Sequence, residues 1–319
     1  MARNPERNDR KSGKKPAGPD KPRGRGDGPQ SGPRQGGKGP VASGHDRGGS
    51  DRGGPDRGGW NPNPPTRGFS DSAPRPSRAK ADADNFVWGR HPVLAALANP
   101  ARKGTGRLLA TPDRAAELER DKLTHGHRIE QIEPQALDRM LPPGAVHQGL
   151  AFKVQPLEGV ALDDIAHEGG VIVMLDQLTD PQNVGAIFRS ALAFGAKGIV
   201  VQDRHSPALA GALAKASAGA TERLPCARVT NLSRALETLA DMGWRAVGLD
   251  GSAEQTLEQA LDERPTVLVM GSEGDGIRRL VAEHCDVLAK IPMPGGFESL
   301  NVSNAAAVAL YEASKKQAG

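Results

Sequence analysis

The chain has 319 residues, which is long enough for two folded domains that each bury a core. Residues 1–80 carry 18 Lys and Arg against 8 Asp and Glu, a net charge of +10, whereas the other 239 residues carry 24 against 30, a net charge of −6. No apolar run approaches the roughly 20 residues of a membrane helix, and Cys226 and Cys285 are far apart without metal-ligand spacing. These features argue against a membrane protein and a disulfide framework, so we expect a cytoplasmic chain without a bound metal.

The N-terminal segment is rich in glycine, proline and arginine. Residues 1–80 contain 17 Gly and 13 Pro and almost nothing that could build a core, so we expect residues 1–84 to be disordered. An Asp-Arg-Gly-Gly sequence begins at Asp46 and recurs at Asp51 and Asp56. Arg-Gly-Gly repeats can bind RNA through charge and through stacking of the guanidinium on bases, although each Asp cancels part of that charge. The basic tail is therefore either an RNA-binding or a solubilising segment.

Strands and helices alternate over residues 85–154. This alternation predicts a small α/β domain, followed by a linker over residues 155–170 with one short helical turn. His91 and His147 lie in this domain without a nucleophile nearby, so we assign them no chemistry. The spacing predicts a strand from Phe86 and a helix that starts at Pro92, further strands over 107–110, 129–132 and 146–154, and helices over 115–122 and 134–140.

A second α/β domain is predicted over residues 171–319. Residues 171–176 form a continuous apolar run that ends in a carboxylate, which is typical of a buried parallel strand. The pattern indicates a doubly wound sheet, in which ligands bind at the C-terminal ends of the strands. Further strands are expected over 199–201, 245–250 and 266–270, and helices from Val184 onward and over 209–216, 234–242, 277–284 and 302–312.

Three loops are expected to meet at those strand ends: residues 180–183 with Arg189 after them, residues 271–276, and residues 291–301. Arg189 lies roughly 130° from the centre of the apolar stripe of its helix and therefore projects to the polar flank. The glycines of residues 271–276 are spaced G-x-x-G-x-G and come late in the domain, which does not fit a dinucleotide fingerprint, and no Walker sequence is present. Taken alone, these glycines also fit a tight turn between a strand and a helix.

The third loop leads directly into an apolar helix. Ser299, Asn301 and Ser303 are residue types that bond the free N–H groups at a helix start, and Leu300 between them is expected to be buried. A polar, glycine-containing loop beside a core helix is a favourable place for a ligand. The apolar stripe of that helix is formed by Val302, Ala305, Ala306, Ala309 and Leu310.

Taken together, the three loops carry motifs that resemble those of the SpoU (TrmH-like) RNA ribose 2′-O-methyltransferases of the SPOUT superfamily. The motifs are D-x-x-x-D-P-x-N-x-G-A-x-x-R-S-A over residues 176–191, V-M-G-S-E-G-x-G over 269–276, and I-P-M-x-G-x-x-x-S-L-N-V-S over 291–303. The resemblance covers residues 86–316. It is strongest to the ribosomal-RNA branch that methylates a guanosine in the peptidyl-transferase P loop of 23S ribosomal RNA. In that branch, the segment corresponding to residues 85–154 is an L30e-like domain that binds the substrate RNA.

The resemblance implies properties that the residue pattern alone does not. The second domain should contain a deep trefoil knot, an exception to the rule that folds avoid knots. The methyl donor should be S-adenosylmethionine, and the protein should be a homodimer with the active site near the two-fold interface. The family positions that bind the donor correspond to Gly271, Ile291 and Leu300, with Met270, Pro292 and Met293 beside them.

The resemblance also implies the catalytic positions. The Arg equivalent to Arg189 is proposed as the base in related enzymes, but a guanidinium normally stays charged. Arg189 would then bind the adjacent phosphate and stabilise the developing oxyanion. For Glu273, an anchoring role for its own loop is as plausible as contact with substrate. The full catalytic set is Asn183, Arg189, Glu273, Ser299 and Asn301.

Three other functions compete with ribosomal-RNA methylation. A transfer-RNA ribose methyltransferase would use the same chemistry, but the separate N-terminal domain favours ribosomal RNA. A catalytically silent RNA-binding or ribosome-assembly protein would not need the matched residues Asn183, Arg189, Ser299 and Asn301. A hydride-transferring Rossmann enzyme is disfavoured because the glycines of residues 271–276 come too late in the domain for a dinucleotide fingerprint.

Overall fold

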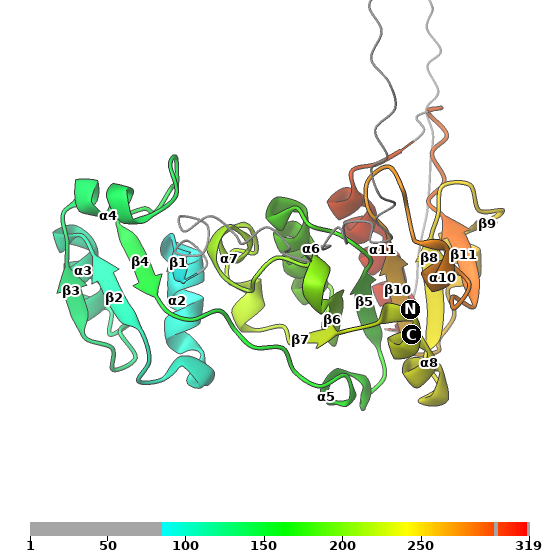
Figure 1. The fold of residues 1–319 in the computed structure, drawn as a ribbon, viewed down its shortest axis with the longest axis horizontal. Coiled ribbons are helices and arrows are strands. Elements are labelled where there is room, and N and C mark those ends of the chain that lie inside the picture. Colours follow the sequence, from blue (N-terminus) through cyan, green and yellow to red (C-terminus); the bar gives the residue numbers. More distant parts are fainter. Residues whose placement is uncertain (1–84, 297–298, 318–319) are drawn as a thin grey trace, which may run out of the picture. The chain divides into compact units, whose positions relative to one another are not determined.

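The computed structural model describes residues 85–296 and 299–317, all within one compact unit of the chain (Figure 1). The tail that we expect to be disordered lies outside these residues, and so do residues 297–298 of the third motif. None of the helices in the described part has the length and the apolar character needed to cross a bilayer.

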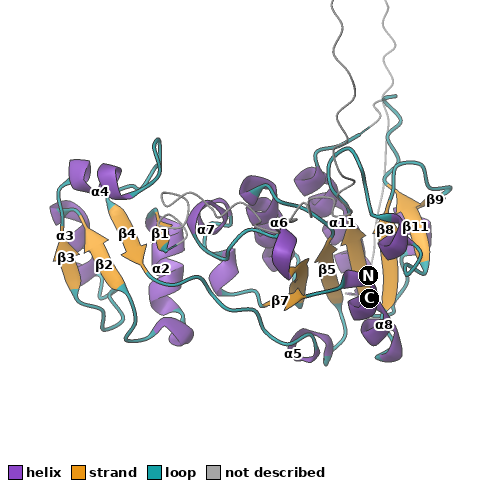
Figure 2. Ribbon diagram, viewed as in Figure 1, coloured by secondary structure: helices purple, strands orange, loops and turns teal. Residues whose placement is uncertain are grey.

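The first of two β-sheets has four strands in the order β1-β4-β2-β3 (Figure 2). β4 is antiparallel to β1 and β2, whereas β3 is parallel to β2. Helices pack on both faces, α2 and α3 against one core cluster and α4 against another. The elements are β1 (Phe86–Trp88), α2 (Arg90–Ala98), a 3₁₀ turn η1 (Pro100–Arg102), β2 (Arg107–Ala110), α3 (Pro112–Arg120), β3 (Ile129–Gln131), α4 (Pro134–Met140) and β4 (Leu150–Lys153).

Two predicted boundaries in this sheet were wrong for local reasons. β4 begins at Leu150 and not at residue 146, because Gln148 and Gly149 adopt positive φ angles of 55° and 79°. A strand cannot continue through that backbone conformation. The helix expected from residue 115 begins at Pro112, where the proline follows an extended Thr111 and is preorganised for the first helical turn.

The second sheet has seven parallel strands in the order β7-β6-β5-β10-β8-β11-β9. Its strands are β5 (Val171–Leu175), β6 (Gly198–Gln202), β7 (Cys226–Val229), β8 (Arg245–Leu249), β9 (Gln255–Thr256), β10 (Thr266–Met270) and β11 (Val287–Lys290). The helical segments are α5 (Asp163–Ala166), α6 (Pro181–Ala193), two 3₁₀ turns η2 (Asp203–His205) and η3 (Ala220–Glu222), α7 (Gly211–Ala216), α8 (Leu232–Asp241), α9 (Leu257–Ala260), α10 (Arg279–Ala282) and α11 (Val302–Gln317).

Helices cover both faces of this sheet, which confirms the doubly wound α/β prediction. Val171, Val173 and Leu175 of β5 pack in a core with residues of α6, α7, α9 and α11. Ile172 and Met174 of the same strand face the other way, into a core with residues of α5, α8 and α10. Alternate residues of β5 are thus buried on opposite sides, as expected for a central parallel strand.

The prediction of one helix over residues 277–284 was wrong. The structure has only the short α10, because Arg278 has an extended backbone with φ −59° and ψ 142°. The strands β7, β9 and β11 were not predicted.

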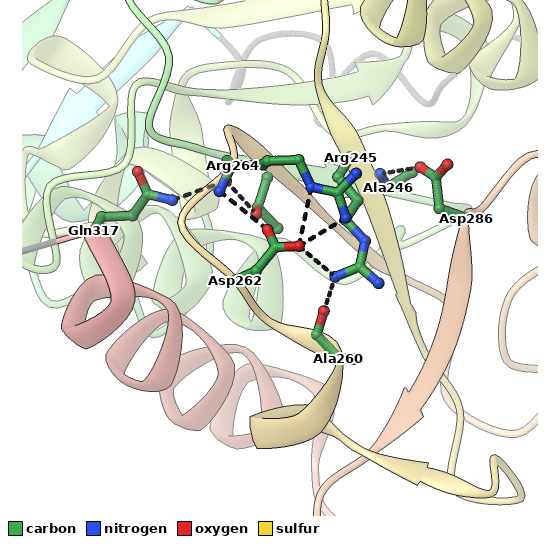
Figure 3. Close-up of polar contacts among 8 residues, drawn as sticks. Arg245, Ala246, Ala260, Asp262, Arg264, Asp286 and Gln317 are labelled. Atoms are coloured by element: carbon green, nitrogen blue, oxygen red, sulfur yellow. Dashed lines mark hydrogen bonds and ion pairs between the residues drawn. The ribbon is translucent and has the colours of Figure 1, made fainter. Parts of the chain in front are cut away.

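A polar network joins the ends of the strands that lie away from the three motif loops (Figure 3). The Asp262 carboxylate accepts bonds from Arg264 Nη2 at 2.7 Å and from Arg245 Nη1 at 3.3 Å, and the same Arg245 atom donates to the Ala260 carbonyl. Gln317, at the end of α11, donates to the Arg264 carbonyl at 2.9 Å. The Arg264 guanidinium, as the main cause, lowers the pKa of Asp262 below its usual value. The network therefore attaches the end of α11 to the loop before β10.

A buried ion pair joins the two 3₁₀ turns η1 and η3. Arg102 Nε and Nη2 each donate to one Glu222 carboxylate oxygen at 2.8 Å, and Arg102 Nη1 donates to the Gln155 carbonyl at 2.8 Å. Asn99 Nδ2 also donates to Glu222 at 2.8 Å. The exposed fractions of the Arg102 and Glu222 side chains are 4% and 1%. Removing one partner would leave the other charge buried without compensation.

We expect the Glu222→Gln variant to lose about 3 kcal/mol of unfolding free energy, since the buried Arg102 guanidinium loses its counter-charge. Urea denaturation measures this loss directly. The matched control is Glu130→Gln, which breaks an equally bidentate pair with Arg107 on the surface, where the side chains are 56% and 50% exposed. This control should lose much less stability. Equal losses of unfolding free energy in the two variants would show that the buried Arg102–Glu222 pair matters no more for stability than the exposed pair.

Candidate active site

The three motif loops follow the C-terminal ends of strands in the seven-stranded sheet. Residues 176–180 follow β5, residues 271–276 follow β10, and residues 291–301 follow β11. β5 and β10 are neighbours, and only β8 separates β10 from β11. Because all these strands are parallel, their C-terminal ends lie at the same edge of the sheet, where ligands of such folds bind.

The first motif fixes the start of α6. The Asp180 carboxylate accepts bonds from the backbone N–H groups of Gln182 at 3.2 Å and Asn183 at 3.1 Å. This side-chain cap satisfies two N–H groups that the helix itself leaves free. Asn183 is therefore held in the first turn of α6, beside the loop that follows β10.

Three predicted catalytic residues from separate loops meet at one carboxylate oxygen. Glu273 Oε1 accepts bonds from Asn183 Nδ2 at 3.2 Å and from Asn301 Nδ2 at 2.7 Å. Asn301 Nδ2 also lies 3.0 Å from Asn183 Oδ1, and the Val302 N–H donates to Glu273 at 3.3 Å. These contacts tie all three loops together, so Glu273 anchors its own loop.

Asn301 has a second task at the start of α11. Its Oδ1 accepts bonds from the Ser303 N–H at 3.0 Å and the Ser303 hydroxyl at 2.5 Å. The residue that caps this helix is thus Asn301, and its amide nitrogen faces Glu273 and Asn183 at the same time. The orientation of the Asn301 amide is therefore set on both sides.

A pocket of about 640 Å³ opens beside this cluster. We call it the strand-end pocket; it is lined by the ends of β8, β10 and β11, by residues 271–276, and by the start of α11. Its volume is in the range of sites for cofactors and drug-sized ligands. Eight predicted site residues line it: Met270, Gly271, Glu273, Ile291, Met293, Ser299, Leu300 and Asn301.

The loop of residues 271–276, here named the glycine loop, folds tightly onto itself. Ser272 and Gly276 exchange two backbone hydrogen bonds, each 3.1 Å long. A Cβ atom on Gly271 would lie 2.0 Å from the carbonyl carbon of Gly276, so no other residue fits there. The loop can therefore offer backbone groups to a ligand at close range.

Sequence reasoning missed two acidic residues of the strand-end pocket, Asp250 and Asp275. Asp250, directly after β8, lines it. Its Oδ1 accepts bonds from the Ser252 hydroxyl and N–H, both at 2.7 Å, and these bonds lower the pKa of Asp250 below its usual value. Asp250 thus stays ionised and favours a cationic ligand. The pattern of an apolar strand that ends in a carboxylate, already noted at Asp176, could have identified it.

Arg189 lies apart from the other predicted catalytic residues. Its side chain is exposed, and it makes no hydrogen bond or ion pair with any residue in the described part of the chain. Neither Arg189 nor Asn183 lines the strand-end pocket of its own chain. Arg189 is six residues beyond Asn183 on α6, which places it about 9 Å along the axis and about 120° around it. The guanidinium is therefore free to bind a group that comes from outside.

Two details of the third loop differ from expectation. Leu300, expected to be buried, is 41% exposed and stands at the strand-end pocket. Polar neighbours on both sides suggested burial, but the side chain faces the pocket and not the core. Pro292 is not part of the pocket lining, although Ile291 and Met293 on either side of it are.

Of the two histidines noted in the sequence, His147 makes structural contacts, and His91 makes no side-chain hydrogen bond or ion pair with a described residue. His147 Nδ1 accepts a bond from the Gly149 N–H at 3.0 Å, and its Nε2 lies 3.1 Å from Asp138 Oδ1. These contacts hold the turn before β4. Within residues 85–296 and 299–317, no three His, Cys, Asp or Glu side chains are grouped so that they could hold a metal ion.

Models of known protein families match both domains of the chain. Residues 170–311 match the model of the SpoU rRNA Methylase family, and residues 86–160 match the RNA 2′-O ribose methyltransferase substrate-binding model. An uncharacterized tRNA/rRNA methyltransferase of Mycolicibacterium smegmatis is 40% identical over 247 residues, 75% of this chain and 78% of the relative. A protein of the same description from Mycobacterium avium is 37% identical over 267 residues, 81% and 86% of the two chains.

Solved structures show the same fold. The SpoU methyltransferase AviRb from Streptomyces viridochromogenes, in complex with the cofactor AdoMet, is 29% identical, with a TM-score of 0.61 over 73% of this chain and 90% of that chain. An AdoMet-bound rRNA methyltransferase from Sinorhizobium meliloti, 23% identical with a TM-score of 0.60 over 72% and 86%, is similar in fold. The chain belongs to the SpoU family of RNA 2′-O-ribose methyltransferases, whose methyl donor is S-adenosylmethionine.

Proposed function

We propose that the protein methylates the ribose 2′-hydroxyl of a guanosine in 23S ribosomal RNA, within the peptidyl-transferase P loop. The observation that carries the proposal is the meeting of Asn183, Glu273 and Asn301 at the rim of a cofactor-sized pocket. The separate N-terminal domain, which matches the substrate-binding model of the family, supports a structured RNA as the substrate. The same separate domain favours ribosomal RNA over transfer RNA as that substrate.

The strand-end pocket fits the methyl donor in size and in charge. When bound, S-adenosylmethionine would supply a methyl group from its positively charged sulfonium. The methyl–sulfur bond would break as the bond from the methyl carbon to the ribose oxygen forms, leaving a neutral thioether, and the 2′-hydroxyl proton would pass to solvent. Asp250, Glu273 and Asp275 give the pocket three carboxylates that favour a cation, and Lys290 adds one positive charge. Gly271, Ile291 and Leu300 would hold the donor, with Met270 and Met293 beside them and Pro292 keeping the third loop in shape.

The residues of the cluster would position the ribose. Transfer of a methyl group needs the attacking oxygen in line with the methyl carbon and the sulfur, so positioning supplies much of the rate. Asn183 and Asn301 have amide groups whose orientation the Glu273 carboxylate fixes, and Ser299 offers a hydroxyl on the pocket wall. Arg189 would bind the neighbouring phosphate and stabilise negative charge that develops on the 2′-oxygen.

The decisive experiment uses the purified full-length protein and radiolabelled S-adenosylmethionine. It is incubated in parallel with large-subunit ribosomal RNA, with precursor particles of the large subunit and with bulk transfer RNA, and ribose methylation is then mapped. We expect label in one P-loop guanosine of the 23S RNA. Label in transfer RNA would overturn the substrate. Donor binding by calorimetry without label in any RNA would favour a catalytically silent RNA-binding protein.

The proposal includes a homodimer in the cytoplasm and a trefoil-knotted methyltransferase domain. On α11, Asn304, Val308 and Tyr311 form an exposed stripe at helical spacing, and Val308 and Tyr311 are 43% and 54% exposed. The Tyr311 ring lies 5.9 Å from that of Phe194, the C-cap residue directly after α6. A second copy of the chain would cover this exposed stripe and bring Arg189 of α6 close to the interface.

The Val308→Asp variant should dissociate the dimer, since a carboxylate without a partner would be buried in the interface. We expect the dissociation constant to rise about 100-fold, as measured by light scattering during size-exclusion chromatography over a dilution series. The matched control is Met242→Asp, because Met242 is 40% exposed at the end of α8, away from α11. Val308→Asp that remains dimeric at every concentration would remove this stripe from the interface.

A further inference from the structure

Asp176, the first residue of the first motif, has no place in the proposed chemistry, yet it is fully buried directly after β5. A buried carboxylate is costly unless charge and hydrogen bonds compensate it. Arg278 supplies both. Its backbone N–H donates to Asp176 Oδ2 at 2.9 Å, and its Nε and Nη2 lie 2.8 and 2.6 Å from Oδ1.

The backbone of Asp176 makes a second contact on the other side of the glycine loop. Its N–H donates to the Met270 carbonyl at 2.8 Å. Met270 directly precedes residues 271–276, and Arg278 comes two residues after them. One residue directly after β5 thus holds the chain where it enters the glycine loop and where it leaves it.

Arg278 is also fixed from its outer side. Its Nη2 donates to Gln202 Oε1 at 3.0 Å, and Gln202 Nε2 donates in turn to the Thr230 carbonyl at 3.1 Å. Gln202 ends β6, and Thr230 follows β7. The Arg278 side chain, although 40% exposed, is therefore held, directly or through Gln202, by the ends of three neighbouring strands.

We propose that Asp176 and Arg278 form a clasp that closes the base of the glycine loop and thereby sets the affinity for S-adenosylmethionine. This inference rests on the proposed function of the strand-end pocket. Asp176 and Arg278 act as positioning residues. A loop that is already held in its binding conformation loses less entropy when the ligand binds. The same loop presents Glu273 to Asn183 and Asn301, so the clasp also holds the ribose-positioning cluster.

The sequence offers a matched pair for the test. Arg278 and Arg279 are adjacent arginines that both make ion pairs. Arg279, the first residue of α10, pairs on the surface with Glu283, which directly follows that helix. We compare Arg278→Met with Arg279→Met in the full-length protein. Asp176 keeps the backbone N–H of residue 278 in both variants, so the fold should persist.

Two measurements are made on each variant. Calorimetry gives the dissociation constant for S-adenosylmethionine, and hydrogen exchange without ligand reports opening of the peptide that contains the glycine loop. For Arg278→Met we expect about 10-fold weaker donor binding and faster exchange in that peptide, whereas Arg279→Met should stay within about 2-fold of the wild type. Arg278→Lys, which keeps the charge and one donor, should recover part of the affinity.

The outcomes separate the inference from the function on which it rests. Equal donor affinity in Arg278→Met and Arg279→Met, or equal loss in both, would overturn the clasp. A wild-type protein that does not bind S-adenosylmethionine would overturn the proposed function itself. If Arg278→Met does not fold, Arg278→Lys is compared with Arg279→Lys, and only the first should bind the donor more weakly.

Discussion

Replacing Gly271 with alanine should abolish binding of S-adenosylmethionine while most of the fold remains. The Cβ atom would lie 2.0 Å from the carbonyl carbon of Gly276, 2.1 Å from its oxygen and 2.2 Å from the nitrogen of Ile277. All three are backbone atoms, which cannot rotate away as a side chain does. The glycine loop would have to open and would no longer line the strand-end pocket. We expect donor affinity to fall by about 100-fold or more, as measured by calorimetry.

Gly295→Ala is the matched control for that experiment. Gly295 lies in the third loop, has open space where a Cβ would be placed, and does not have a positive φ angle. Its replacement should leave donor affinity within about 2-fold of the wild type, because a Cβ atom there meets no neighbouring atom and Gly295 does not line the strand-end pocket. Normal donor binding by Gly271→Ala would mean that the glycine loop is not part of the donor site.

The central strands could be predicted from the sequence because their burial leaves a strong pattern. All five residues of β5 and of β10 are buried, and all of them except Thr266 are apolar. β7, β9 and β11 lack this pattern, since β7 and β11 mix apolar and charged residues and β9 has only two residues, Gln255 and Thr256. β7 and β9 are the two edge strands of the sheet. The inner strand β11 lies between β8 and the two-residue β9 and is only partly buried, so the sequences of all three strands resemble those of loops.

The site could be predicted only in part, for a reason that concerns sequence distance. Asn183 and Glu273 are 90 residues apart and Asn183 and Asn301 are 118 apart, yet their side chains bond one another. Local patterns hold no information on such pairs, and the resemblance to family motifs supplied them. The choice of Arg278 over the adjacent Arg279 as the partner of Asp176 could not be predicted at all. It depends on the extended backbone at residue 278, which the helical pattern did not reveal.

Arg189→Ala should lower the turnover number by about 10²–10³-fold while leaving donor affinity and stability unchanged. Stability should not change, because the exposed Arg189 side chain has no bonded partner within the described residues. Donor affinity should not change, because Arg189 does not line the strand-end pocket of its own chain. The control is Arg234→Ala, an exposed arginine on α8, which covers the opposite face of the sheet from α6.

In the homodimer proposed above, mixed dimers would show which subunit Arg189 serves. In a dimer of one Arg189→Ala chain and one Gly271→Ala chain, an intact strand-end pocket and an intact Arg189 are found only on different subunits. Because Arg189 is about 9 Å along α6 from Asn183 and about 120° around it, we expect it to act at the pocket of the partner. Mixing the two inactive variants should then restore methylation at one of the two sites. Activity that stays absent after exchange of subunits would place Arg189 at its own pocket, and full activity of Arg189→Ala alone would remove it from the mechanism.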